Sequence, residues 1–214
     1  MQRLQIIKIG AAINITLVIF ILTACKKNSG NDLHSPIIYK DIKPDDSILL
    51  GTDSMSFTVD INGDGINDFI FYNNYHTFTG AFPCAQYIGH MNAAFIQPLN
   101  ANQVFDFSVD TTAIIDSSLQ IPNLSNYTWD TARLVLYSGT TGPDPFHGCS
   151  YTTNNGGYFW ILSPTYIGVK INTAQHSYYG WIRINFDDDL NKFAVMDYAY
   201  NSDPDQPIKP GQIK

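Results

Sequence analysis

The chain has 214 residues, a formal net charge of -7, and few charged residues at 14% beside an equal share of aromatic ones. An acidic domain repels the phosphate backbone, so nucleic-acid binding is excluded as a function class. Every acidic residue is Asp and none is Glu, and 15 Gly and 11 Pro accompany them. This composition favours short strands and tight turns over helices. We predict an all-β fold, a jelly-roll-like antiparallel β-sandwich, as a single domain over residues 36–214.

Residues 1–24 are predicted to be a signal peptide. Arg3 and Lys8 give a positive start, and an apolar run over 9–22 follows. Leu22-Thr23-Ala24-Cys25 resembles the lipobox of bacterial lipoproteins, which implies that Cys25 is the lipidated mature N-terminus. The alternative, a transmembrane helix, is disfavoured because the apolar run is short. Residues 25–35 read as a flexible tether, so we expect a lipid-anchored protein of the bacterial cell envelope, in the outer membrane, with the membrane as one partner.

A stretch rich in oxygen-bearing side chains, Asp60–Asp68, lies between two predicted strands, Met55–Val59 and Phe69–Tyr72. Calcium loops place oxygen ligands at alternate positions around a turn-forming Gly, which is Gly65 here. The candidate ligands for a structural Ca2+ are Asp60, Asn62, Asp64, Ile66 through its carbonyl, and Asp68. Phe71 stands where an EF-hand has its bidentate Glu, so no EF-hand is predicted. A metal-free turn is the alternative, since Asn-Gly and Asp-Gly form turns unaided.

The middle of the chain gives weaker signals. Residues 73–92 read as an irregular, aromatic-rich connection and 138–148 as a loop with two Pro and three Gly. The predicted strands of this region are Ala93–Gln97, Thr112–Asp116 and Ala132–Tyr137.

Cys84 and Cys149 are the remaining cysteines, and in an exported protein two such thiols usually pair. We predict a Cys84–Cys149 disulfide. A metal site formed by both cysteines with His147, and with His76 or His90, is a less favoured alternative because the spacing matches no zinc pattern. A catalytic Cys-His pair is less favoured still.

The C-terminal half predicts four strands in an antiparallel meander, because short turns separate apolar, β-prone segments. These strands are Gly157–Leu162, Tyr166–Asn172, Tyr179–Phe186 and Lys192–Tyr200. Arg183 is expected to form a structural cation–π contact with Trp181 or a salt bridge within the sheet. The run 187–189 of three Asp is read as a solvated turn in preference to a second cation site.

Three segments together resemble the C-terminal signature of a broad group of bacterial secreted and surface-anchored proteins: Tyr179-Gly180-Trp181-Ile182-Arg183, then Asp197-Tyr198-Ala199-Tyr200-Asn201, then Pro207-Ile208-Lys209-Pro210-Gly211-Gln212. Pro210 stands where the group usually has Ala. Members of the group often carry an Asp-rich loop near the start of the domain, as at Asp60–Asp68. The resemblance implies an all-β domain at the cell surface and no enzyme activity.

Three functions remain open from the sequence. The favoured one is a non-catalytic binding module for a glycan or a protein, with aromatic side chains that stack on sugar rings. The candidates for such stacking are Trp129, Trp160, Trp181 and the stretch Tyr72–Tyr75. A secreted glycan hydrolase is an alternative, although the chain shows no familiar hydrolase motif. A structural or adhesive envelope protein is the third.

Overall fold

The structure, a computed structural model, describes residues 35–51, 55–82, 85–106, 120–122, 128–143, 151–156, 165–187 and 191–214. Residues Ser35–Lys214 form one compact unit. No helix in the described ranges has the length and apolarity needed to cross a membrane. The predicted signal peptide, Cys25 and almost all of the tether lie outside the described residues.

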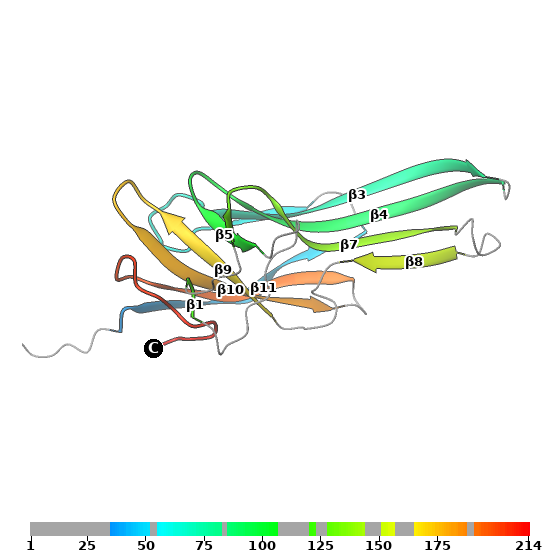
Figure 1. The fold of residues 1–214 in the computed structure, drawn as a ribbon. Helices are drawn as coiled ribbons and strands as arrows, with labels where there is room; N and C mark the ends of the chain where they lie inside the picture. The colour runs from blue at the N-terminus through cyan, green and yellow to red at the C-terminus, as the bar shows by residue number, and fades with distance from the viewer. Residues whose placement is uncertain are drawn as a thin grey trace, which may run out of the picture. The chain divides into compact units, whose positions relative to one another are not determined.

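The predicted all-β fold is confirmed: the described chain is built of strands in two antiparallel sheets (Figure 1). The six-stranded sheet has the order β1-β11-β10-β9-β5-β6, and the five-stranded sheet has the order β2-β3-β4-β7-β8. The strands are β1 (Ile37–Leu49), β2 (Ser56–Val59), β3 (Phe69–Phe82), β4 (Ala85–Pro98), β5 (Gln103–Asp106), β6 (Thr128–Asp130), β7 (Leu134–Pro143), β8 (Tyr151–Gly156), β9 (Thr165–Asn172), β10 (Ser177–Asp187) and β11 (Lys192–Asn201).

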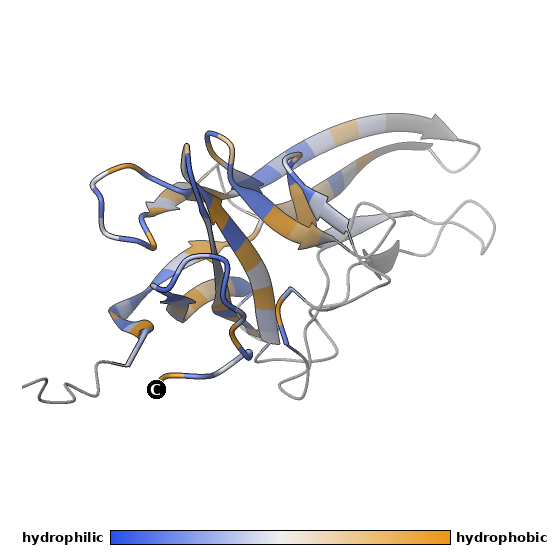
Figure 2. Cartoon of the chain, turned by 60° about the vertical axis from the view of Figure 1, so that its left-hand side comes forward, coloured by the Kyte–Doolittle hydropathy of each residue, from blue (hydrophilic) through white to orange (hydrophobic). Residues whose placement is uncertain are grey.

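The main core lies between the two sheets. Along the second half of β10 buried residues alternate with half-buried ones, whereas β11 has runs of three buried residues because both of its faces are covered, and Figure 2 shows hydrophobic and hydrophilic residues alternating along the strands. Alternate side chains point to opposite faces of a sheet, so one set from each sheet meets in the middle. Fully buried members of this core are Phe69, Phe71, Ile96, Leu136, Ile167, Ile182 and Phe193.

A second, smaller core covers the outer face of the six-stranded sheet. Trp181 belongs to it, whereas the next residue, Ile182, belongs to the main core, as the strand alternation requires. The C-terminal segment lies over Trp181: the indole N–H donates to the carbonyl of Gln212 at 3.2 Å. Ile208 of the same segment pairs its backbone with Ile121. The end of the chain therefore acts as a cover for this face.

The prediction for residues 73–92 is wrong. They form most of a long hairpin in which β3 and β4 pair from Phe69↔Pro98 to Phe82↔Ala85, and this hairpin extends farthest to the right in Figure 1. Mixed polar and aromatic residues conceal it, because the main core takes its buried side chains from the other end of these strands. Without a one-sided apolar face, the usual strand pattern is missing.

Part of the predicted loop at 138–148 is also strand, since β7 continues to Pro143 between β4 and β8. Its Gly residues suggested a turn, but Gly142 lies within the strand. The neighbouring glycine of β4, Gly89, has the packing role, because a side chain there would collide with the ring of Phe78, whose Cζ would lie 2.3 Å from the added Cβ. Gly89 leaves room for the aromatic ring to lie across the sheet.

β1, β5, β6 and β8 were not predicted. From Lys40 to Asp46 β1 contains five charged residues and Pro44, a pattern that does not indicate a strand. Charges and proline are also the features with which natural proteins protect an edge strand, and β1 lies at the edge of its sheet. The predicted strands at 112–116 and 157–162 lie outside the described residues.

Candidate functional site: the Asp60–Asp68 loop and the adjoining groove

The loop between β2 and β3 is folded by its own side chains. The carboxylate of Asp60 accepts the backbone N–H groups of Gly63 and Gly65, both at 2.8 Å. Asp64 accepts the N–H of Ile66 at 2.8 Å and the side-chain amide of Asn62 at 3.0 Å. Gly63 and Gly65 have φ values of 73° and 86°, which residues with a Cβ adopt at a cost. The predicted spacing of Asp, Asn and Gly thus produces a tight, curved turn.

Asp68 ends the loop and ties it to the opposite sheet. Its carboxylate is buried and accepts the N–H of Ile61 and the side-chain amide of Asn102, each at 2.8 Å. Asn102 in turn accepts the N–H of Asn172 on β9, also at 2.8 Å. Burial raises the pKa of Asp68 above its ordinary value, although these hydrogen bonds act in the other direction.

Two tyrosines of β11 hold the other side of the loop. The hydroxyl of Tyr198 donates to the carbonyl of Asp60 at 2.9 Å, and that of Tyr200 donates to the carbonyl of Asn62 at 3.4 Å. Both tyrosines belong to the sequence signature noted above. The two parts of that signature, the Asp-rich loop and the C-terminal strands, are therefore in direct contact in the fold.

Beside the loop lies an open groove of about 700 Å³. It runs along the side of the sandwich where β1 and β2 are the outermost strands of their sheets. Tyr198 contributes to its lining from β11. The wall from the first sheet is Ile38–Lys43 with Asp46, and the wall from the second is Thr58–Gly63 with Asn67. The predicted metal loop thus forms part of one wall of this groove.

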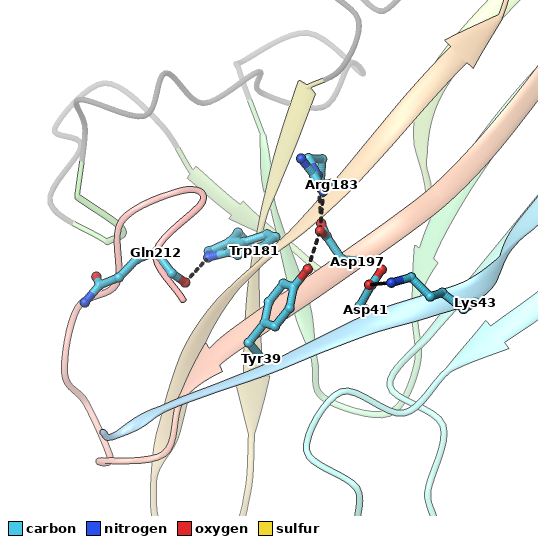
Figure 3. Close-up of polar contacts among 7 residues, drawn as sticks. All are labelled: Tyr39, Asp41, Lys43, Trp181, Arg183, Asp197 and Gln212. Atoms are coloured by element: carbon cyan, nitrogen blue, oxygen red, sulfur yellow. Dashed lines mark hydrogen bonds and ion pairs between the residues drawn. The ribbon is translucent and has the colours of Figure 1, made fainter. Parts of the chain in front are cut away.

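An ion pair between a half-buried arginine and a buried aspartate joins β10 and β11. The guanidinium of Arg183 binds the carboxylate of Asp197, with Nε donating to Oδ1 at 2.8 Å and Nη2 donating to Oδ2 (Figure 3). Asp197 is 1% exposed, and its Oδ2 also accepts the hydroxyl of Tyr39 at 2.8 Å. Of the two structural roles expected for Arg183, the salt bridge is therefore the one found.

The pKa of Tyr39, whose hydroxyl contacts this ion pair, is raised. Burial of the hydroxyl, together with the hydrogen bond to Asp197, raises the pKa of Tyr39 from 10.0 to about 12. Because the folded-state pKa is the higher one, the protonated hydroxyl contributes its full stability below pH 10. That contribution is lost as the pH rises towards 12.

The aromatic candidates for ligand stacking have different positions. Trp181 is 1% exposed and lies under the C-terminal segment, so it is a core residue and presents no surface for a sugar. Trp129 is half-buried against Phe105. Tyr72 is half-buried and stacks on Phe95 at 5.1 Å between ring centroids, on β3 and β4. Trp160 lies outside the described residues.

Most of the predicted cysteine chemistry also falls outside the described residues, since Cys84, Cys149 and His147 lie there, as do Asp188 and Asp189 of the acidic run. His90 is described, and its Nδ1 lies 2.7 Å from the hydroxyl of Tyr75. Nowhere in the described ranges do three His, Cys, Asp or Glu side chains gather as a metal site would require.

Fold and site together define a two-sheet β-domain with an open groove along one edge. Compared with known proteins, the chain matches no family model, no curated protein and no solved structure. Sequence reasoning found the loop but missed the groove, because the groove depends on which strands end each sheet.

Proposed function

We propose that this protein is a lipid-anchored bacterial envelope protein whose β-sandwich binds a glycan or protein ligand without converting it chemically. The groove of about 700 Å³ between β1 and the loop is the observation that carries the proposal. Ligand sites commonly have volumes of about 300 to 1,000 Å³. The leader-like residues 1–24 and Cys25, which resembles a lipidated cysteine, support export and anchoring.

Calcium is the proposed structural ion of the loop. Calcium prefers carboxylate, amide and carbonyl oxygens, and the loop supplies all three kinds. Each side-chain oxygen keeps a lone pair beyond the hydrogen bond that it accepts, so the donor atoms are of the kind that calcium prefers, although the three carboxylates do not gather around one point in this structure. The residues that would hold it are Asp60, Asn62, Asp64, Asp68 and the carbonyl of Ile66. The hydrogen bonds within the loop also fold it without an ion, so a direct test is needed.

An ion in the loop would stiffen one wall of the groove. Asp60 and Asn62 belong both to the loop and to the groove lining. Tyr198 and Tyr200 hold their carbonyls against β11, so the loop is already fixed on the side of the first sheet. Calcium would neutralise the charge of the half-buried Asp60 and of the exposed Asp64. The ion's role in the proposal is thus to shape the groove.

We expect calcium to stabilise the fold modestly. With a dissociation constant of about 0.1 to 1 mM, typical of extracellular modules, about 5 mM calcium adds about 1 to 2 kcal/mol to the free energy of unfolding. For a domain of this size the melting temperature then rises by about 2 to 9 °C. Differential scanning calorimetry in calcium and in chelator measures this shift.

Asp64→Ala removes one proposed ligand and should abolish the shift. Asp203→Ala removes an exposed carboxylate far along the chain from the loop and should preserve it. A melting temperature that is the same in calcium and in chelator would show that the turn is metal-free.

The binding function is tested by screening the whole protein in detergent on a glycan array and against a displayed library of random dodecapeptides. We expect a ligand from one of the two collections, bound more weakly in chelator. Tyr198→Phe removes the hydroxyl that holds the carbonyl of Asp60, so it should weaken binding while preserving the core ring. Tyr179→Phe, a tyrosine that does not line the groove, is the matched control.

A further inference from the structure

We propose that the groove binds an extended peptide segment of a partner protein, which adds as a new strand along the free edge of β1. This inference rests on the proposed binding function and names the ligand class of the same site.

Both walls of the groove are made of consecutive residues. Ile38–Lys43 line one side and Thr58–Gly63 line the other. Side chains of a strand alternate between two faces, so a face would contribute only every second residue to a lining. The unbroken run Ile38–Lys43 shows instead that the edge of β1, with its backbone groups, borders the groove. On the other wall β2 contributes only Thr58 and Val59, and the loop contributes the rest. Within the described residues, β1 pairs only with β11 and β2 pairs only with β3.

The register shows which backbone groups of β1 point into the groove. The N–H of Ser202 donates to the carbonyl of Pro36 at 2.7 Å, in line with the pairing of Ile37 with Asn201. In an antiparallel pair the residues that bond to the partner strand alternate with residues that point away. Because Pro36 bonds to β11, the N–H and C=O groups of Tyr39 and Asp41 point away from it. The regular stretch Ile37–Asp41 is about 17 Å long.

The opposite wall repeats this arrangement. The N–H of Asn73 donates to the carbonyl of Met55 at 3.1 Å, so alternate residues from Met55 onward bond to β3. The backbone of Thr58 consequently points away from β3 and towards the groove. At the next such position the carbonyl of Asp60 already accepts the hydroxyl of Tyr198. This contact leaves less free edge on β2 than on β1, which favours β1 as the pairing strand.

The charges of the groove favour a basic segment. Lys43 pairs with Asp41 at 2.5 Å, and Lys40 lies 5.7 Å from the ring centroid of Tyr198. One further carboxylate of the lining, that of Asp46, is neither paired with Lys43 nor assigned to the calcium ion. A lysine or arginine on the incoming strand can meet it.

The shape of β1 limits the length of the added strand. The pairing of β1 with β11 shifts register between Asp41 and Asp46, and Pro44 lies in that interval. Proline offers no N–H to a partner, so the usable edge ends near Asp41. A short edge with charges also resists indiscriminate strand pairing. The groove is therefore suited to one short extended segment.

The test uses dodecapeptides selected from the display library on the whole protein in detergent. Each selected peptide is resynthesised with single N-methyl groups along its backbone, and its affinity is measured by calorimetry. Strand addition predicts losses of about tenfold or more at every second position, because only alternate N–H groups bond to the edge. Equal effects at neighbouring positions, or none, would overturn the inference.

A matched pair of variants tests the protein side. Asp41→Pro removes an N–H that points into the groove, and it costs no bond to β11 by the register above. Asp41→Ala removes the same carboxylate but keeps the N–H. Binding of the selected peptide should weaken about tenfold in Asp41→Pro and stay within about twofold in Asp41→Ala. Equal losses in both variants would overturn the inference.

The two proposals fail differently. If only glycans bind the protein, the peptide inference is overturned while the binding function stands. If neither collection yields a ligand, both are overturned.

Discussion

Replacing Arg183 by alanine is expected to lower the free energy of unfolding by about 3 to 5 kcal/mol, because the carboxylate of Asp197 would remain buried without its cation. Asp197 is 1% exposed, and the guanidinium supplies two of the hydrogen bonds that it accepts. The remaining donor shown is the neutral hydroxyl of Tyr39, which is too weak a partner for a full charge. Urea denaturation followed by tryptophan fluorescence measures the loss.

Arg133→Ala is the matched control, since this arginine is exposed and lies 4.9 Å from the ring centroid of Phe95. Its loss should cost about 1 kcal/mol or less. The double variant Arg183→Met with Asp197→Leu removes both charges and should recover most of the stability. If Arg183→Ala lowers the free energy of unfolding by no more than Arg133→Ala does, the carboxylate of Asp197 reaches water or becomes protonated without penalty.

The sequence was informative where a feature depends on neighbouring residues. The Asp-Asn-Gly spacing between Asp60 and Asp68 predicted the turn between two strands, and apolar, β-prone segments separated by short turns predicted β9, β10 and β11 closely. This apolar pattern is strong there because the main core and the smaller core bury side chains on both faces of these strands. It fails in the outer part of the β3–β4 hairpin, where burial on one side no longer dictates the pattern.

The groove could not be predicted in this way. It exists because β1 and β2, adjacent in sequence, are placed in different sheets and both end their sheet on the same side. The sequence of β1 carries only an indirect signal, its charges and Pro44, which serves equally well for a loop. Likewise, nothing local to Asp68 indicates that its carboxylate contacts Asn102, because the contact joins residues from separate strand connections.

The signature segments acquire a common structural explanation. Gly180 has no room for a side chain, since an added Cβ would lie 2.7 Å from the carbonyl of Ala199. Gly211 has a φ of 75°, and a Cβ there would lie 2.8 Å from the hydroxyl of Tyr166. These glycines allow the C-terminal segment and the neighbouring strands to approach closely over Trp181. The signature segments therefore pack closely together around Trp181. They also hold the Asp60–Asp68 loop through Tyr198 and Tyr200.

This close packing around Trp181 predicts the second large loss of stability. Trp181→Ala should lower the free energy of unfolding by about 3 to 5 kcal/mol, because it leaves a cavity in the smaller core. Trp181 is 1% exposed, contacts Tyr166 edge to face at 5.3 Å between centroids, and donates to Gln212. Calorimetric or urea unfolding measures the loss, and Trp181→Phe should recover part of it because a ring still fills the space.

The position of Trp181 also predicts a local effect on the C-terminal segment that the loss of a main-core side chain would not produce. Residues 207–214 are held over this face by Ile208 and by the indole N–H, so Trp181→Ala should release them. Limited carboxypeptidase digestion followed by mass spectrometry should then remove these residues several times faster than in the unchanged protein. Phe71→Ala destabilises the main core without touching this cover and should not do so under native conditions. If both variants lose the C-terminal residues equally fast, the C-terminal segment is held by the global stability of the fold and not by its own contact with Trp181.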